Sequence, residues 1–146
     1  MAFRFPLAQV LKYRESLEQR EYLALETIQH QIFETDRRIE KCEARSAAAR
    51  KRRESDLDRG VSSVHLQAVV ELEMACEKQR EELQVRLQQL QAQRLQALKA
   101  YELARQNREV LDELRKKQFE SYHREQAKRE QIMLDDLFLS QRKRAH

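Results

Sequence analysis

Apolar residues in the first part of the chain recur at alternating spacings of three and four, which is the seven-residue repeat of a coiled coil. The repeat is clearest from Leu25 to Cys42, at positions 25, 28, 32, 35, 39 and 42. Thr35 is its weak position. Pro6 suits the first turn of a helix, where its missing N–H would have no partner. The pattern predicts a helix over about residues 6–55.

A second and longer repeat follows, with one apolar row and one half-polar row. The apolar row consists of every seventh residue from position 69: Val69, Cys76, Leu83, Leu90, Ala97, Ala104 and Leu111. The companion row contains Leu66, Leu87 and Tyr101 but also Glu73, Arg80, Arg94 and Arg108. One apolar row beside one half-polar row is typical of a two-stranded antiparallel hairpin whose outer side is exposed to solvent. We expect this second helix over about residues 63–140.

The repeat is lost between these segments, where the only glycine stands at position 60. Gly60 can adopt a positive φ, and Ser62 or Ser63 can cap a new helix. The chain is therefore predicted to reverse over about residues 56–62. Pairing about this turn places Leu11 near Leu111, Ile32 against Leu87 and Leu90, and Cys42 near Cys76. Residues from about 116 onward would continue as a single helix.

Composition supports this all-α hairpin. One glycine and one proline among 146 residues leave almost no turn chemistry, and 37% of the residues are charged. The 29 basic and 25 acidic side chains give a net charge of +4, which suits helix surfaces carrying ion pairs. We predict a single coiled-coil hairpin over residues 1–146.

Nothing in the sequence predicts catalysis. A single glycine excludes a phosphate-binding glycine loop, and the four histidines lack metal-ligand spacing. We expect no enzyme activity, no cofactor, no metal and no small-molecule substrate. Cys42 and Cys76 are interpreted as reduced thiols that fill small seam positions, with a disulfide as the alternative. No signal peptide or membrane-spanning segment is recognisable, so the chain is predicted to be cytoplasmic.

The densest basic run is Arg50–Arg53. Four successive residues wrap around a helix, and no aromatic residues interleave with them to stack on nucleic-acid bases. We interpret the run as a solvated hairpin tip. Docking to an acidic protein and binding to nucleic acid are the alternatives.

Aromatic and aliphatic residues gather at the other end of the hairpin. Phe3 and Phe5 open the chain, and the extension beyond residue 116 adds further apolar side chains. We expect a partner to contact this end. The predicted contact residues there include Phe119, Tyr122, Leu137 and Phe138.

The opening "FRFPLAQVLKYRESLE" resembles that of the flagellar export protein family FliJ. The chain length and the "GVSS" turn before a longer second helix are also similar. The resemblance implies a non-enzymatic, stalk-like coiled coil of the flagellar type III export apparatus. Its implied partners are the export ATPase, a FliI-like hexamer, an FlhA-like export-gate protein and export chaperones.

The resemblance also implies a location and two contact faces. The protein would be cytoplasmic and peripheral at the inner face of the membrane through the export gate. Phe3, Phe5, Arg14 and the helix beyond about 116 would face the ATPase ring. Leu72 and Ala75 match a gate-binding face of the family, whereas Ala68 and Gln79 depart from it.

Three other functions stay open at this point. The chain could be a nucleic-acid-associated coiled coil that uses Arg50–Arg53 and Arg142–Arg144, a self-assembling structural coiled coil, or the virulence-secretion counterpart of the same stalk.

Overall fold

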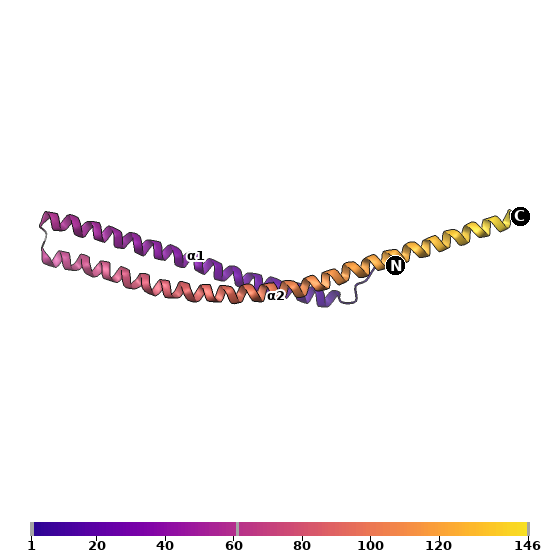
Figure 1. The fold of residues 1–146 in the computed structure, drawn as a ribbon, viewed down its shortest axis with the longest axis horizontal. Helices are drawn as coiled ribbons and strands as arrows, with labels where there is room; N and C mark the ends of the chain where they lie inside the picture. Colours follow the sequence, from indigo (N-terminus) through magenta and orange to yellow (C-terminus); the bar gives the residue numbers. More distant parts are fainter. Residues whose placement is uncertain (1, 61, 146) are drawn as a thin grey trace. The chain divides into compact units, whose positions relative to one another are not determined.

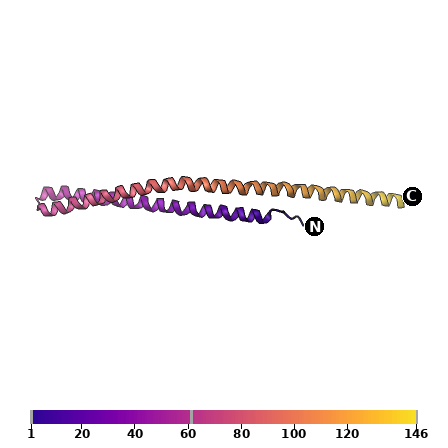
Figure 2. The same ribbon diagram turned by 90° about the horizontal axis from the view of Figure 1, so that it is seen from below.

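The computed structural model describes residues 2–60 and 62–145, and residue 61 of the predicted turn lies outside the described residues. It contains two helices, α1 over Ala8–Arg59 and α2 over Ser63–Arg144, and no strand among the described residues. The two helices run antiparallel on either side of the turn (Figures 1 and 2). The all-α prediction of a helical hairpin with a longer second helix is confirmed.

The helix ends differ from the predicted ones by a few residues. α1 begins at Ala8 rather than residue 6, and ends at Arg59 rather than residue 55. Residues 50–59 contain no helix breaker, so the helix continues until Gly60, whose φ of 70° ends it. The Gly60 N–H donates to the Leu57 carbonyl oxygen at 3.3 Å. α2 begins at Ser63 as expected and continues to Arg144, where three basic residues in the last turn favour the negative end of the helix dipole.

Contacts divide the chain into two compact units. One is Glu21–Tyr101, and the other combines Met1–Arg20 with Glu102–His146. Each unit holds a section of α1 against a section of α2. The single-domain assignment of residues 1–146 therefore stays a prediction.

In the unit Glu21–Tyr101, contacts between side chains hold α1 against α2. Arg53 Nη1 lies 2.8 Å from Glu73 Oε2, and Arg50 Nε lies 3.4 Å from Glu73 Oε1. Farther along the two helices, the ring centroids of Tyr22 and Tyr101 are 5.8 Å apart. The half-polar row of α2 thus meets both charged and aromatic residues of α1.

The predicted pairing of Ile32 with Leu87 and Leu90 stays a prediction, because the contacts of Glu73 with Arg50 and Arg53 and of Tyr101 with Tyr22 are compatible with more than one alignment.

Both cysteines are buried and free. The expected proximity of Cys42 and Cys76 stays a prediction.

The most buried side chains line this seam. Leu90 is 1% exposed, and Cys42, Ala49, Val69 and Cys76 are also buried. Thr35 is buried as well, and its hydroxyl donates to the Gln31 carbonyl oxygen at 2.7 Å. The polar atom at the weak seam position is thereby satisfied within α1 itself.

The other unit has a short seam of its own. Leu11 is 3% exposed and Phe5 is buried just before α1. The Ala8 N–H donates to the Phe5 carbonyl oxygen at 3.2 Å, which ties the first residues to the start of the helix. Glu18 of α1 forms an ion pair with Arg108 of α2, so opposite charges also join the two helices in this unit.

Candidate partner-binding surfaces

An aromatic cluster joins the first residues of the chain to α2. The ring of Phe3 lies edge-on to Phe119, with 5.4 Å between centroids, and 5.5 Å from Tyr122. Phe119 also contacts His123 at 4.3 Å. The predicted single-helix extension from residue 116 is therefore corrected, because Phe3 covers part of α2 as far as Tyr122.

A shallow pocket opens beside this cluster. Its volume is about 360 Å³, and Phe3, Arg115, Lys116 and Phe119 line it. Aromatic faces combined with two cationic side chains favour apolar groups that carry or neighbour negative charge. The pocket is thus suited to a protein segment with apolar and acidic residues.

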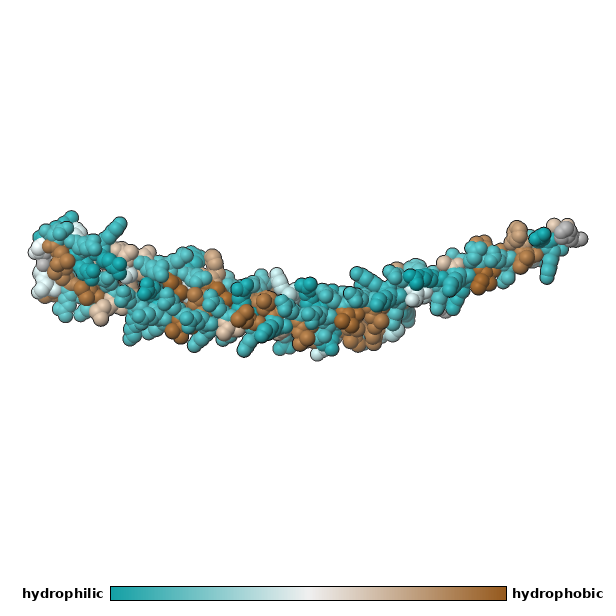
Figure 3. Space-filling model, viewed as in Figure 1, coloured by the Kyte–Doolittle hydropathy of each residue, from teal (hydrophilic) through white to brown (hydrophobic). Residues whose placement is uncertain are grey.

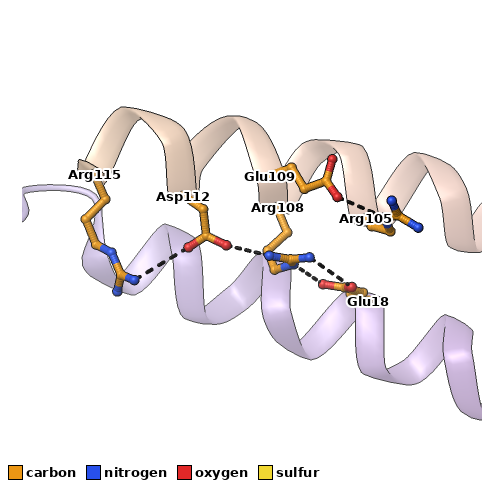
Figure 4. A network of polar contacts seen from close by, with 6 residues as sticks. All are labelled: Glu18, Arg105, Arg108, Glu109, Asp112 and Arg115. Atoms are coloured by element: carbon orange, nitrogen blue, oxygen red, sulfur yellow. Dashed lines mark hydrogen bonds and ion pairs between the residues drawn. The ribbon is translucent and has the colours of Figure 1, made fainter. Parts of the chain in front are cut away.

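A polar network holds α1 and α2 together next to the cluster (Figure 4). The Arg108 guanidinium donates from Nε and Nη2 to the two carboxylate oxygens of Glu18, and from Nη1 to Asp112. Arg115 lies 3.7 Å from the second Asp112 oxygen. Hydrogen bonds to Glu18, and then to Asp112, raise the pKa of Arg108 above its usual value. Arg108 is therefore charged at neutral pH and holds both carboxylates as a cation.

Beyond this network, α2 exposes large apolar side chains. Every described residue from 127 to 145 is exposed. Phe138 is 64% exposed, and the other large apolar residues of this stretch are Ile132, Met133, Leu134, Leu137 and Leu139. Brown patches mark this part of the helix in Figure 3. We call residues 132–139 the apolar end segment.

The predicted contact residues are distributed over these features. Phe3, Phe119 and Tyr122 come together, whereas Phe5 is buried against the start of α1 and Arg14 is half-buried on α1. Leu137 and Phe138 belong to the apolar end segment. No observation assigns a partner to any of them, so their contact roles stay predictions.

The two residues of the predicted gate face lie in the other unit. Leu72 is 54% exposed, and Ala75 is exposed on the same side of α2 one turn later. Both flank the buried row that contains Val69 and Cys76. Leu72 thus lies outside the hairpin seam, where a partner can reach it.

The basic run at residues 50–53 is partly neutralised. Arg53 and Arg50 both bind the buried carboxylate of Glu73, at 2.8 Å and 3.4 Å. Nearby, His65 Nε2 lies 2.9 Å from the buried Asp56. These contacts hold the tip of the hairpin together, while Arg50, Lys51 and Arg52 all stay exposed to solvent.

Sequence reasoning missed these polar pairs, although their signal was present. Glu18 and Glu73 face the opposite helix, and each has a cationic partner there, Arg108 and Arg53 respectively. Asp56 pairs with His65, which lies only nine residues farther along the chain, across the turn. Opposite charges in matching layers of an antiparallel pair are the pattern that could have found them.

The described residues contain no group of three or more histidine, cysteine, aspartate or glutamate residues that could hold a metal ion. Neither α1 nor α2 has a described stretch that is apolar enough to cross a membrane.

Comparison with protein families decides the relationship of the chain. The family described as "Flagellar FliJ protein" matches residues 3–145 of the 146. The chain belongs to the FliJ family. Comparison with curated proteins gave no match, and comparison with solved structures gave none either. FliJ membership makes this a protein associated with flagellar export and protein transport.

Proposed function

We propose that this protein is a non-enzymatic, stalk-like component of the flagellar type III export apparatus that binds the ring of the export ATPase. The observation that carries the proposal is the apolar end segment. Successive helical residues point about 100° apart, so its six large apolar residues project in nearly all directions. Asp135 and Asp136 interrupt this surface, but apolar side chains on opposite sides of a helix favour a partner that contacts more than one side.

A ring-shaped partner fits this requirement better than a flat one. A flat surface would cover one side of the segment and leave Ile132 and Leu139, or Met133 and Leu137, in water. A FliI-like hexamer can enclose the helix from all sides. Because a single helix lacks sixfold symmetry, it would contact the ATPase subunits unequally and so bias their nucleotide states.

The aromatic cluster would extend the same contact. Phe3, Phe119 and Tyr122 lie with two cations around one pocket, and Arg14 is within the same unit. Phe5 is buried and would act by holding Phe3 in place. We propose that acidic and apolar residues of the ATPase occupy this pocket.

A second face would serve the export gate. Leu72 and Ala75 offer an exposed apolar surface beside the seam, and the family resemblance assigns this position to an FlhA-like protein. Binding there would place the protein at the inner face of the membrane without a span of its own. Assistance to export chaperones is part of the same proposal.

The ATPase contact is tested with glutamate substitutions in the full chain. The double variant Ile132→Glu/Leu139→Glu places two charges on one side of the apolar end segment. We expect its affinity for the purified export ATPase to fall at least about tenfold, because two buried apolar contacts become charged. Isothermal titration measures the loss.

The control has the same charge change on residues that are already polar. Gln131→Glu/Gln141→Glu adds two carboxylates to the same part of α2 and should leave binding nearly unchanged. Equal affinities of the two double variants would contradict enclosure of the segment. Removal of residues 116–146 is a poorer test, since it also removes the rings that hold Phe3.

The gate contact has its own test. Leu72→Glu should abolish capture of the gate protein's cytoplasmic part, and Glu71→Gln serves as an exposed neighbour that should retain it. Unchanged capture by Leu72→Glu would remove this face from the proposal and leave the ATPase contact unaffected.

A further inference from the structure

Arginines recur at every seventh residue in the second half of α1. The row consists of Arg38, Arg45, Arg52 and Arg59, and all four side chains are exposed. Seven residues make two turns of a coiled-coil helix, so the four side chains form one line of about 32 Å along α1. None of the four forms an ion pair with another described residue. We call these four residues the arginine row.

The exposed acidic side chains of the same stretch lie on the other side of α1. At about 100° per residue, each exposed acid between residues 36 and 59 points at least about 140° away from Arg45. These acids are Asp36, Glu40, Glu43, Glu54 and Asp58. On the side of the arginine row, Asp56 is buried and is bound to His65. Charge is therefore segregated here, whereas an ordinary solvated helix surface mixes the two signs.

The contact between His65 and Asp56 shows which side of α2 adjoins the arginine row. His65 Nε2 lies 2.9 Å from Asp56 Oδ2. On α1, Asp56 has Arg52 one turn before it and Arg59 one turn after it. Leu72 follows His65 by seven residues and so continues along the same side of α2. Leu72 therefore lies on the side of the hairpin that carries the arginine row.

The ion pairs of Glu73 give the position of Leu72 along the hairpin. Glu73 binds Arg50 and Arg53 of α1. Leu72 directly precedes Glu73, so it lies at the level of residues 50–53 and close to Arg52. An exposed leucine beside a line of guanidinium groups combines an apolar contact with hydrogen-bond donors for carboxylates. Arginine is also among the residues that contribute most to binding energy in protein interfaces.

We propose that the partner bound at Leu72 lays an acidic amphipathic helix along this side of the hairpin and pairs its carboxylates with the arginine row. The proposal deepens the gate contact of the proposed function and rests on it. Apolar residues of the bound helix contact Leu72 and Ala75. Aspartate or glutamate side chains that are two turns apart, about 10 Å, reach Arg45 and Arg52.

Other anionic surfaces fit the arginine row less well. The hairpin is two helices wide, about 20 Å, and does not enter a DNA major groove of about 12 Å. A helix that binds an anionic membrane inserts large apolar side chains among the lipids. Here Lys41, Ala48 and Ser55 lie beside the arginines. The row therefore favours a protein partner with carboxylate side chains.

Charge reversal in the full chain tests the proposal. Arg45→Glu/Arg52→Glu should weaken binding to the purified cytoplasmic part of the gate protein at least about tenfold in isothermal titration, because carboxylates then face carboxylates. Arg124→Glu/Arg129→Glu makes the same charge change at exposed positions of α2 outside the unit Glu21–Tyr101 and should leave binding nearly unchanged. Circular dichroism checks that each variant keeps its helix content.

A conservative variant separates carboxylate pairing from attraction to a negative surface. Arg45→Lys/Arg52→Lys keeps both charges but loses the planar fork that holds a carboxylate through two hydrogen bonds. It should weaken binding to the gate protein about threefold. Binding equal to that of the unsubstituted chain would overturn the paired carboxylates. Retention of the chain on vesicles of phosphatidylglycerol, with gate affinity unaffected by Arg45→Glu/Arg52→Glu, would overturn the proposal in favour of a membrane contact.

The outcome for Leu72→Glu distinguishes this proposal from the gate contact on which it rests. If Leu72→Glu abolishes capture of the gate protein while Arg45→Glu/Arg52→Glu binds like its control, the gate contact stands and the acidic helix is wrong. If Leu72→Glu leaves capture unchanged, the gate contact is wrong and the proposal falls with it. Loss of binding in both variants, with the control intact, supports the acidic helix.

Discussion

Two stretches of α2 carry similar residues in opposite surroundings. Residues 69–90 bury Val69, Cys76 and Leu90 against α1, whereas residues 132–139 leave six large apolar side chains in water. In the first stretch the apolar residues follow one heptad row with polar residues around it; in the second they point in nearly all directions. The first pattern is satisfied by one neighbouring helix. The second pattern cannot be covered by one neighbouring helix.

Polar residues at the seam explain why the first stretch has a single alignment. An apolar row alone would tolerate a slip by one heptad. A slip by seven residues would take Glu73 away from Arg50 and Arg53. Charged side chains in matching layers thus supply the specificity that leucines do not.

The largest expected change in the free energy of unfolding comes from an introduced disulfide that tests this alignment of the two helices. Ala49 and Cys76 are both buried in the seam, and an alignment that pairs Arg53 with Glu73 predicts that they face each other. Ala49→Cys should oxidise readily with Cys76 and stabilise the hairpin by about 3 kcal/mol through loop closure. Non-reducing electrophoresis and urea unfolding measure both effects. Cys42 and Cys76 of the unsubstituted chain should not cross-link, and if they do, the register is wrong.

The next effect concerns the buried stretch itself. Leu90→Ala removes the most buried side chain, and we expect the free energy of unfolding to fall by about 2–4 kcal/mol. The matched substitution Leu137→Ala, in the exposed stretch, should change it by less than about 0.5 kcal/mol. Urea denaturation followed by circular dichroism compares the two. Similar losses of unfolding free energy in the two variants would contradict the conclusion that only the first stretch is buried.

A smaller loss is expected at the hairpin tip. Glu73→Ala leaves Arg50 and Arg53 without their carboxylate, but both guanidinium groups can still reach water. We expect about 1 kcal/mol of destabilisation. The double variant Glu73→Ala/Arg53→Ala should lose clearly less than the sum of the two single variants. Additive losses would show that the pair does not interact.

The smallest effect concerns Arg108. Arg108→Lys keeps the charge but loses the fork that holds Glu18 and Asp112, at a cost of about 0.5–1 kcal/mol. Because the pKa of Arg108 is raised, its contribution is complete below the ordinary pKa and is lost only as pH rises through the folded value. The difference between variant and parent should therefore stay constant from about pH 6 to pH 10. If the difference in stability between the variant and the parent decreased within this pH range, that difference would have to come from another titrating group.

Much of the fold could be predicted from the sequence, because the heptad spacing from Leu25 to Cys42 and the isolated Gly60 each have one simple structural meaning. The exact register could not, since it depends on Glu73 finding Arg53 across the seam. The first residues were also only partly predictable. Phe3 reaches Phe119 and Tyr122 over a sequence distance that no periodicity describes.

The candidate site was predictable only as a location. Aromatic and aliphatic letters at the two ends of the chain indicate an exposed apolar surface, as is found at Leu137 and Phe138. They do not indicate its partner, because recognition depends on the shape and charge of a second molecule. The ion pairs of Glu18 with Arg108 were missed since both residues look like ordinary surface charges when each helix is considered alone.

The uncovered end of α2 has one more consequence, for the lifetime of its complexes. A lone helix in water holds its backbone hydrogen bonds by intrinsic propensity alone and opens easily. A molecule that binds this helix must therefore offset the conformational entropy that the helix loses when it becomes ordered. This cost shortens the lifetime of the complex. Binding through such a helix is suited to repeated dissociation and rebinding. Long-lived binding is favoured instead by a segment that is already rigid before it binds.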